Sequence, residues 1–122
     1  MKITKEVTEW GIVYYYKDKG YKFVLYFYDD DPLIAYLSSV YVSPRLRHKG
    51  IGNTILQTAE KEALKCGVKK ICLRCDKTLW VHDWYKRYGY KDIGDDELPN
   101  YIWMQKPLKQ NLTNEEIKKY GL

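Results

Sequence analysis

The sequence has no hydrophobic run long enough to cross a membrane, and it has no export signal at its start. A membrane-spanning helix needs about 20 consecutive apolar residues, and the longest apolar stretches of this 122-residue chain are far shorter. Its first ten residues also lack a positively charged start followed by an apolar segment. We therefore expect a cytoplasmic protein without membrane contact.

Cysteine is scarce, and its number is odd. Cys66, Cys72 and Cys75 cannot all pair, and a chain without an export signal is expected to keep its thiols free. Cys72-x-x-Cys75 has the spacing of half a zinc site, but residues three apart on a strand point to opposite faces. The acidic run 29–31 before Pro32 is expected to be a hydrated turn. We therefore expect no metal.

A basic tail or arm is also absent, although the formal net charge is +5. The densest cationic cluster is Arg45, Arg47, His48 and Lys49, and it stands directly beside Gly50. That placement favours a phosphorylated small molecule over a long polyanion, so nucleic acid is an unlikely partner.

Length and composition predict a single domain. At 122 residues and 45% hydrophobic, the chain can bury one core but not two. We expect the domain to span residues 1–106 and a C-terminal tail to occupy residues 107–122. In the tail, Thr113 is followed three residues later by Glu116, a capping box that predicts a short helix to Tyr120.

Residues 10–42 predict an antiparallel meander of three strands. The segments 10–17, 21–28 and 34–42 are rich in Val, Ile, Tyr and Phe, and short turn sequences separate them. Such short connections join antiparallel neighbours.

A crossover from strand to helix to strand follows the meander. Between Ile55 and Leu64 the apolar residues recur at helical spacing, and Gly67 stands where this helix would end. Residues 68–75 alternate as a strand, which we expect to lie parallel to the strand at 34–42. The remaining pattern predicts a short helix at 79–88 and strands at 90–93 and 101–105.

The junction between Val40 and Gly52 has the features of an anion site. It runs from a strand through a proline turn into a helix start, where the first N–H groups have no partner inside the helix. Gly50 and Gly52 would let a pyrophosphate approach the backbone, and Arg47 and Lys49 add positive charge around it. The alternative is that the two glycines only permit a tight turn.

Two motifs resemble those of the GNAT N-acetyltransferase family. Arg47-x-x-Gly50-x-Gly52, preceded by Val40-x-Val42-x-Pro44, resembles the family's signature for the pyrophosphate of acetyl-CoA. Trp84-Tyr85-x-x-x-Gly89-Tyr90 resembles its later motif. Together the motifs and their spacing cover residues 37–105.

The resemblance implies transfer of an acetyl group from acetyl-CoA to a primary amine by direct attack. It implies an α/β fold: a mixed, mostly antiparallel central sheet with helices on both faces, of the acyl-CoA N-acyltransferase kind, and a parallel strand pair splayed where CoA inserts. The residues that it assigns to the pyrophosphate are Arg47, His48, Lys49, Gly50, Ile51, Gly52 and Asn53. The residues that it assigns to the pantetheine arm are Val40, Tyr41 and Val42.

The resemblance also assigns a catalytic role to Tyr85, which in the family often lies near the CoA sulfur and can protonate the departing thiolate. The alternative is a packed aromatic side chain whose hydroxyl is satisfied. No base can be transferred, because Ser38, Ser39 and Tyr41 occupy the stretch where a carboxylate often lies. The other candidates for a base are His82, Asp83 and Asp76, each of which is expected to be a surface group. Thr78 and Val81 stand where many members have asparagine and alanine.

Two other functions remain open from the sequence. One is a catalytically silent CoA-binding or regulatory module, and the other is a small basic nucleic-acid-binding protein that stacks bases on its 13 Tyr.

The N-terminus is expected to be shortened, because residues 1–9 are too few for two helices ahead of the meander. The acceptor side should then be open, unless a homodimer or the tail covers it. We expect the acceptor to be a small amine or an exposed amine of a macromolecule.

Overall fold

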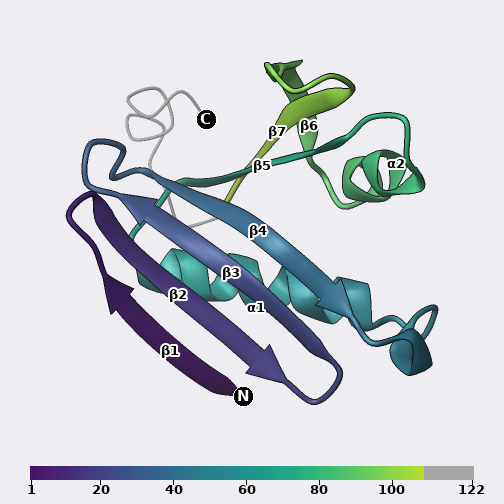
Figure 1. Cartoon of the computed structure of the whole chain (residues 1–122), viewed down its shortest axis with the longest axis horizontal. Coiled ribbons are helices and arrows are strands. Elements are labelled where there is room, and N and C mark those ends of the chain that lie inside the picture. The colour runs from purple at the N-terminus through teal and green to yellow at the C-terminus, as the bar shows by residue number, and fades with distance from the viewer. Residues whose placement is uncertain (109–122) are drawn as a thin grey trace.

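Four antiparallel strands build the N-terminal half of the sheet, and the last three of them are rich in aromatic and aliphatic residues. The computed structural model describes residues 1–108. Each strand pairs with the next along the chain, as Figure 1 shows. The strands are β1 (Lys2–Val7), β2 (Gly11–Asp18), β3 (Tyr21–Tyr28) and β4 (Ile34–Val42).

The C-terminal half of the sheet follows a crossover through a helix. After β4 the chain forms a 3-10 turn, η1 (Pro44–Leu46), and the long helix α1 (Ile51–Lys65), and β5 (Lys70–Asp76) then pairs with β4 in parallel. The last elements are α2 (Trp80–Arg87), β6 (Lys91–Asp95) and β7 (Tyr101–Pro107). The strand order is β1-β2-β3-β4-β5-β7-β6. The predicted mixed, mostly antiparallel sheet and its single parallel pair are therefore confirmed within the described residues.

One strand departs from the expectation. Strand β1 was not predicted, because all six of its residues are exposed and three of them are Lys or Glu, so the usual apolar signal is weak. The segment before the meander thus adds an edge strand to the sheet. The helix predicted from Thr113 to Tyr120 lies outside the described residues.

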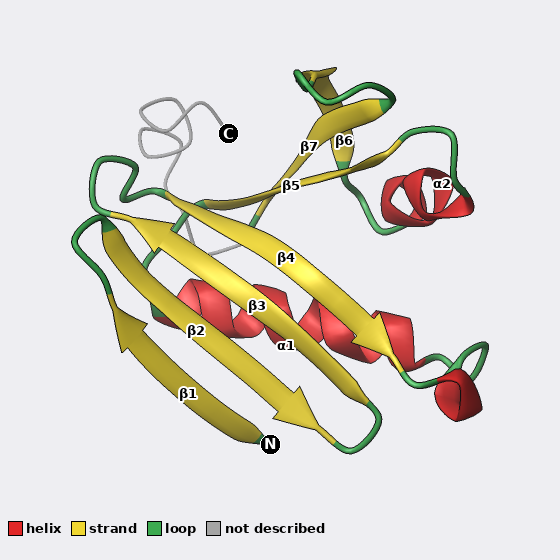
Figure 2. Cartoon of the chain, in the orientation of Figure 1, coloured by secondary structure: helices red, strands yellow, loops and turns green. Residues whose placement is uncertain are grey.

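Helix α1 packs against one face of the sheet, behind the N-terminal strands in the view of Figure 2. Leu25 and Leu37 are cross-strand partners, and they share one buried cluster with Ile55 of α1. Helix α2 joins them on this side, since a Cβ built at Gly52 in α1 would lie only 2.5 Å from the Trp84 ring. Helices were expected on both faces, and in residues 1–108 they cover one.

The opposite face of the sheet is therefore free of helices within the described residues. Because side chains alternate along a strand, the neighbours of the core residues point to this face. They include Tyr26, Tyr28, Tyr36 and Trp103, which are partly buried against one another. In residues 1–108 no helix has the length and apolarity required to pass through a bilayer.

Phe23 tests the assignment of the core face. Its side chain is fully buried and stacks on Tyr16 at a centroid distance of 4.6 Å. We expect Phe23→Ala to lower the free energy of unfolding by about 3–5 kcal/mol through lost burial and a cavity. Tyr15→Ala, on the other face at 38% exposure, should cost about 1 kcal/mol or less. Urea denaturation measures both, and equal losses would contradict the assignment.

Candidate functional site

The parallel strands β4 and β5 separate after only three residue pairs. They pair at Ile34–Lys70, Ala35–Ile71 and Tyr36–Cys72 and then diverge, as Figure 1 shows. Each strand continues beyond that point, so backbone groups facing the gap have no partner strand. An extended ligand can occupy such a gap as an added strand.

A cavity of about 730 Å³ opens at this separation. Most of its wall is aromatic, and it reaches from the helix-free face to α2. It is lined by Tyr26, Tyr28, Tyr36, Leu37, Ser38, Ser39, Val40, Arg74, Tyr85, Tyr101 and Trp103.

A bulge in β4 forms one wall of the cavity. The register pairs Lys22 with Tyr41 and Val24 with Ser38, so a single residue of β3 opposes both Ser39 and Val40. Ser39 has a φ of 55°, in the left-handed region that few residues other than glycine adopt. A bulge leaves backbone groups unpaired and redirects them. Here it does so where Ser39 and Val40 line the cavity.

The loop between β4 and α1 leaves the start of the helix uncapped. The N-cap residue of α1 is Gly50, with a φ of 78°, and no side chain accepts a hydrogen bond from the first turn. The Nε of Arg47 donates to the carbonyl oxygen of Val42 at 3.1 Å, which ties the loop to the end of β4. Unpaired N–H groups and the positive end of the helix dipole together favour an anion at this position.

Gly50 and Gly52 each require glycine for a different structural reason. A Cβ at Gly50 would meet no atom within 4 Å, so Gly50 provides the left-handed conformation and an open approach to the backbone. Gly52 lies inside the first turn of α1, where the Trp84 ring of α2 leaves no room for a side chain. The motif spacing suggested a ligand role for both and gave no sign of this contact between helices.

Tyr85 is one of two buried side chains, with Leu37, among the residues that line the cavity. Its side chain is only 7% exposed, and its ring meets Tyr90 edge-on at 5.6 Å. Burial, with a smaller contribution from Cys75, raises the pKa of the Tyr85 hydroxyl. Cys75 lies three residues beyond the last β4–β5 pair, on the part of β5 that has separated from β4. No hydrogen bond joins the Tyr85 hydroxyl to another residue of the described chain, so the hydroxyl is available to a ligand.

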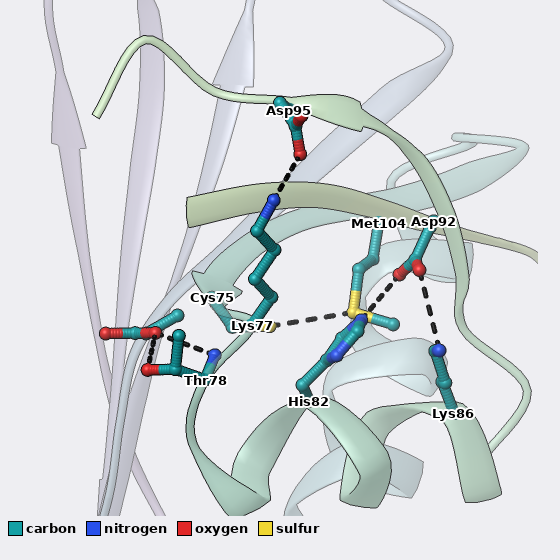
Figure 3. A network of polar contacts seen from close by, with 9 residues as sticks. Cys75, Lys77, Thr78, His82, Lys86, Asp92, Asp95 and Met104 are labelled. Carbon is teal, nitrogen blue, oxygen red and sulfur yellow. Dashed lines mark hydrogen bonds and ion pairs between the residues drawn. The ribbon is translucent and has the colours of Figure 1, made fainter. Parts of the chain in front are cut away.

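Two of the three residues considered as bases, His82 and Asp76, make other contacts, and Figure 3 shows those of His82. His82 Nε2 lies 2.8 Å from Asp92 Oδ1, and Lys86 pairs with the same carboxylate at 3.5 Å. These pairs fasten α2 to β6. Asp76 accepts hydrogen bonds from the backbone N–H and the hydroxyl of Thr78, which lower its pKa. None of His82, Asp83 and Asp76 lines the cavity.

Residues 1–108 contain no cluster of three or more His, Cys, Asp or Glu side chains arranged to hold a metal ion. The three cysteines are free thiols. In the acidic turn, Asp31 accepts a hydrogen bond from the Tyr36 hydroxyl at 2.6 Å.

Comparison with known proteins gives one family match. The model of the acetyltransferase (GNAT) domain matches residues 8–92, which span β2 to the start of β6. No curated protein sequence matches the chain.

Several solved acetyltransferases share the fold at low identity. The PaiA N-acetyltransferase of Thermoplasma acidophilum, in complex with coenzyme A, superposes with a TM-score of 0.65 and 24% identity, over 78% of this chain and 59% of that one. An acetyltransferase of Elizabethkingia anophelis with acetyl-CoA bound gives 0.64 and 18%, over 80% and 76%. The IAA acetyltransferase of Bacillus cereus gives 0.64 and 18%, over 80% and 78%.

The contact between Gly52 and Trp84 predicts a coupling between the two helices. Alanine normally stabilises a helix relative to glycine by about 1 kcal/mol. Here we expect Gly52→Ala to destabilise the protein by about 1–3 kcal/mol, because its methyl group collides with the Trp84 ring. In a Trp84→Leu background the same change should cost little or become stabilising. A double-mutant cycle from thermal unfolding measures this, and a coupling energy near zero would show that the contact is loose.

Proposed function

Because the chain belongs to the GNAT acetyltransferase family, we propose that it transfers the acetyl group of acetyl-CoA to a primary amine by direct attack. The observation that carries the proposal is the position of the uncapped start of α1 directly after the open edge of β4. One end of the gap suits a pyrophosphate, and the gap itself suits an extended thioester arm.

Acetyl-CoA occupies both parts of the site in this proposal. The backbone N–H groups of the loop, Arg47, His48, Lys49, Gly50, Ile51, Gly52 and Asn53, hold the pyrophosphate. The pantetheine arm runs along Val40, Tyr41 and Val42, where β4 has no partner on the side of β5. The backbone supplies these contacts, which fits with the exposed position of the Tyr41 side chain.

The chemical step needs few side chains. The neutral amine attacks the thioester carbonyl, a backbone N–H at the bulge stabilises the oxyanion, and the C–S bond then breaks. Tyr85 donates a hydrogen bond to the departing thiolate. Since burial raises the pKa of Tyr85, its hydroxyl keeps the proton that this role requires.

Water accepts the proton of the amine in this scheme. No carboxylate or histidine occurs among the described residues that line the cavity. A lysine-like amine is neutral in only about 0.04% of molecules at pH 7, so the rate should rise with pH over the neutral range. The helix-free face gives solvent access to the acceptor.

A panel of amines tests the proposal, with release of CoA from acetyl-CoA as the readout. The panel contains polyamines, aminoglycosides, amino acids and lysine peptides. Turnover with any of them supports the enzyme, whereas tight CoA binding without turnover would indicate the silent module. Salt-sensitive binding of oligonucleotides without affinity for CoA would indicate the nucleic-acid-binding protein.

Gly50→Val should abolish CoA binding while the protein stays folded. Its added side chain would stand where the ligand approaches the first turn of α1. Gly67→Val is a matched control, since Gly67 has a φ of 82°, has no atom within 4 Å of a built Cβ, and lies at the other end of the helix. Both variants carry the same backbone strain. Calorimetry with CoA compares them, and equal affinities would refute this location of the pyrophosphate.

Tyr85→Phe should lower kcat by roughly 100-fold and change the affinity for acetyl-CoA by less than about threefold, because a hydrogen bond to the developing thiolate acts mainly in the transition state. In the wild type the raised pKa of Tyr85 keeps the hydroxyl protonated, so kcat/KM should show no falling limb up to about pH 10. Steady-state kinetics across pH measures both. An unchanged rate in the variant would leave Tyr85 with a packing role alone.

A further inference from the structure

Arg74 is the one charged side chain among the described residues that line the cavity beside Tyr85. It lies on β5 two residues beyond the last β4–β5 pair, and its direct partner on β7 is Trp103. Because side chains alternate along a strand, Arg74 points to the same face as Cys72, the β5 partner of Tyr36. This is the helix-free face, from which the acceptor of the proposed reaction would enter.

Two neighbours hold the Arg74 guanidinium in place. It lies over the Trp103 ring at 5.7 Å, and its Nη1 donates to Asp96 Oδ2 at 2.8 Å. Trp103 Nε1 donates to the other oxygen of the same carboxylate at 3.1 Å. The side chain of Asp96 is only 11% exposed, whereas that of Arg74 is 48% exposed. Asp96 is thus a positioning residue, and Arg74 is the member of the pair that faces the cavity.

The pairing with Asp96 leaves other donors of Arg74 unused. A guanidinium has several N–H donors in a planar fork and no acceptor. Within residues 1–108 the bond from Nη1 to Asp96 is the only hydrogen bond that this group makes. Such a fork binds a carboxylate through paired, charge-assisted hydrogen bonds. The charged part of the wall therefore matches a carboxylate of the acceptor, and the described lining has no acidic group for a second cationic group of a polyamine.

Aromatic rings make up much of the remaining wall. Besides Tyr85, the lining includes Tyr26, Tyr28, Tyr36, Tyr101 and Trp103. Such rings pack well against the apolar part of a ligand. The cavity volume of about 730 Å³ also lies within the range of small-molecule sites. The cavity therefore suits a small acceptor that combines an apolar part with a carboxylate.

We propose that the acceptor is a small amine that also carries a carboxylate, and that Arg74 binds this carboxylate while the amine faces the gap between β4 and β5. This inference rests on the proposed acetyl transfer and names the acceptor class of that same site. Ser39 and Tyr85 line the same cavity as Arg74, so the carboxylate and the amine of one molecule lie within a single cavity. Amino acids with an apolar side chain are the simplest members of this class.

Matched acceptors test the inference: phenylalanine, β-alanine and 4-aminobutyrate, each paired with its amide. Conversion to the amide also changes the pKa of the amine, so the ratio of kcat/KM for acid and amide is compared between protein variants, where the intrinsic reactivity of each amine cancels. For at least one pair, Arg74→Gln should lower this ratio about 10- to 100-fold, because charge-assisted hydrogen bonds to the carboxylate are lost.

Lys77→Gln is the matched control. Lys77 is a basic residue near Arg74 that also pairs with an aspartate, Asp95, at 3.0 Å, but it does not line the cavity. It should leave the ratio unchanged. Thermal unfolding checks that both variants are folded. If Arg74→Gln does not fold, Arg74→Lys takes its place, since lysine keeps the charge and loses the planar fork, and a smaller fall in the ratio is expected.

Calorimetry of the same acid and amide pairs with the CoA complex gives a second readout that needs no turnover. Binding of an acid that depends on Arg74, with no acetylation of any amine, would support the inference and contradict the proposed enzymatic function. Turnover with equal ratios in the wild type and both Gln variants would overturn the inference in an active enzyme. Failure of all three acids to bind, or binding that does not depend on Arg74, would also overturn it.

Discussion

The candidate site depends on the early separation of one parallel strand pair. β4 and β5 share three residue pairs and then part, although each strand continues. Backbone groups cannot stay unpaired in a dry interior, so the gap must be open to solvent or filled by a ligand. The bulge at Ser39, the uncapped start of α1 and the buried Tyr85 are all arranged around it. Removing the gap by continuous pairing would remove the site without changing the topology.

The sequence predicted well those features that depend on local pattern. The three strands of the meander, the long helix and the parallel return strand each have a strong periodic signal, and the structure has them in that order. The order of motifs also indicated the family to which residues 8–92 match. The sequence pattern did not predict strand β1, because an exposed edge strand needs no apolar face.

Contacts between distant segments were beyond the reach of the sequence. The pair formed by His82 and Asp92 joins α2 to β6, and no spacing rule indicates it. Four aromatic side chains in contact with one another come from the loop after β1 and from β3, β4 and β7, and only the sheet order brings them together: Trp10, Tyr28, Tyr36 and Trp103. The roles of the loop residues and of Tyr85 stay predictions. The structure gives their positions, which fit those roles.

The contact of Gly52 with Trp84 has a mechanical consequence. Gly52 belongs to the first turn of α1, and Trp84 is the direct neighbour of Tyr85 in α2. The anchor point proposed for the pyrophosphate and the hydroxyl proposed for the thiolate thus lie on two helices that meet at a contact with no room for a further side chain. Because the two helices touch at this point, a shift of one of them requires a shift of the other. In the proposed complex, this contact would set the spacing between the two ends of the bound thioester, independently of the flexible chain that connects them.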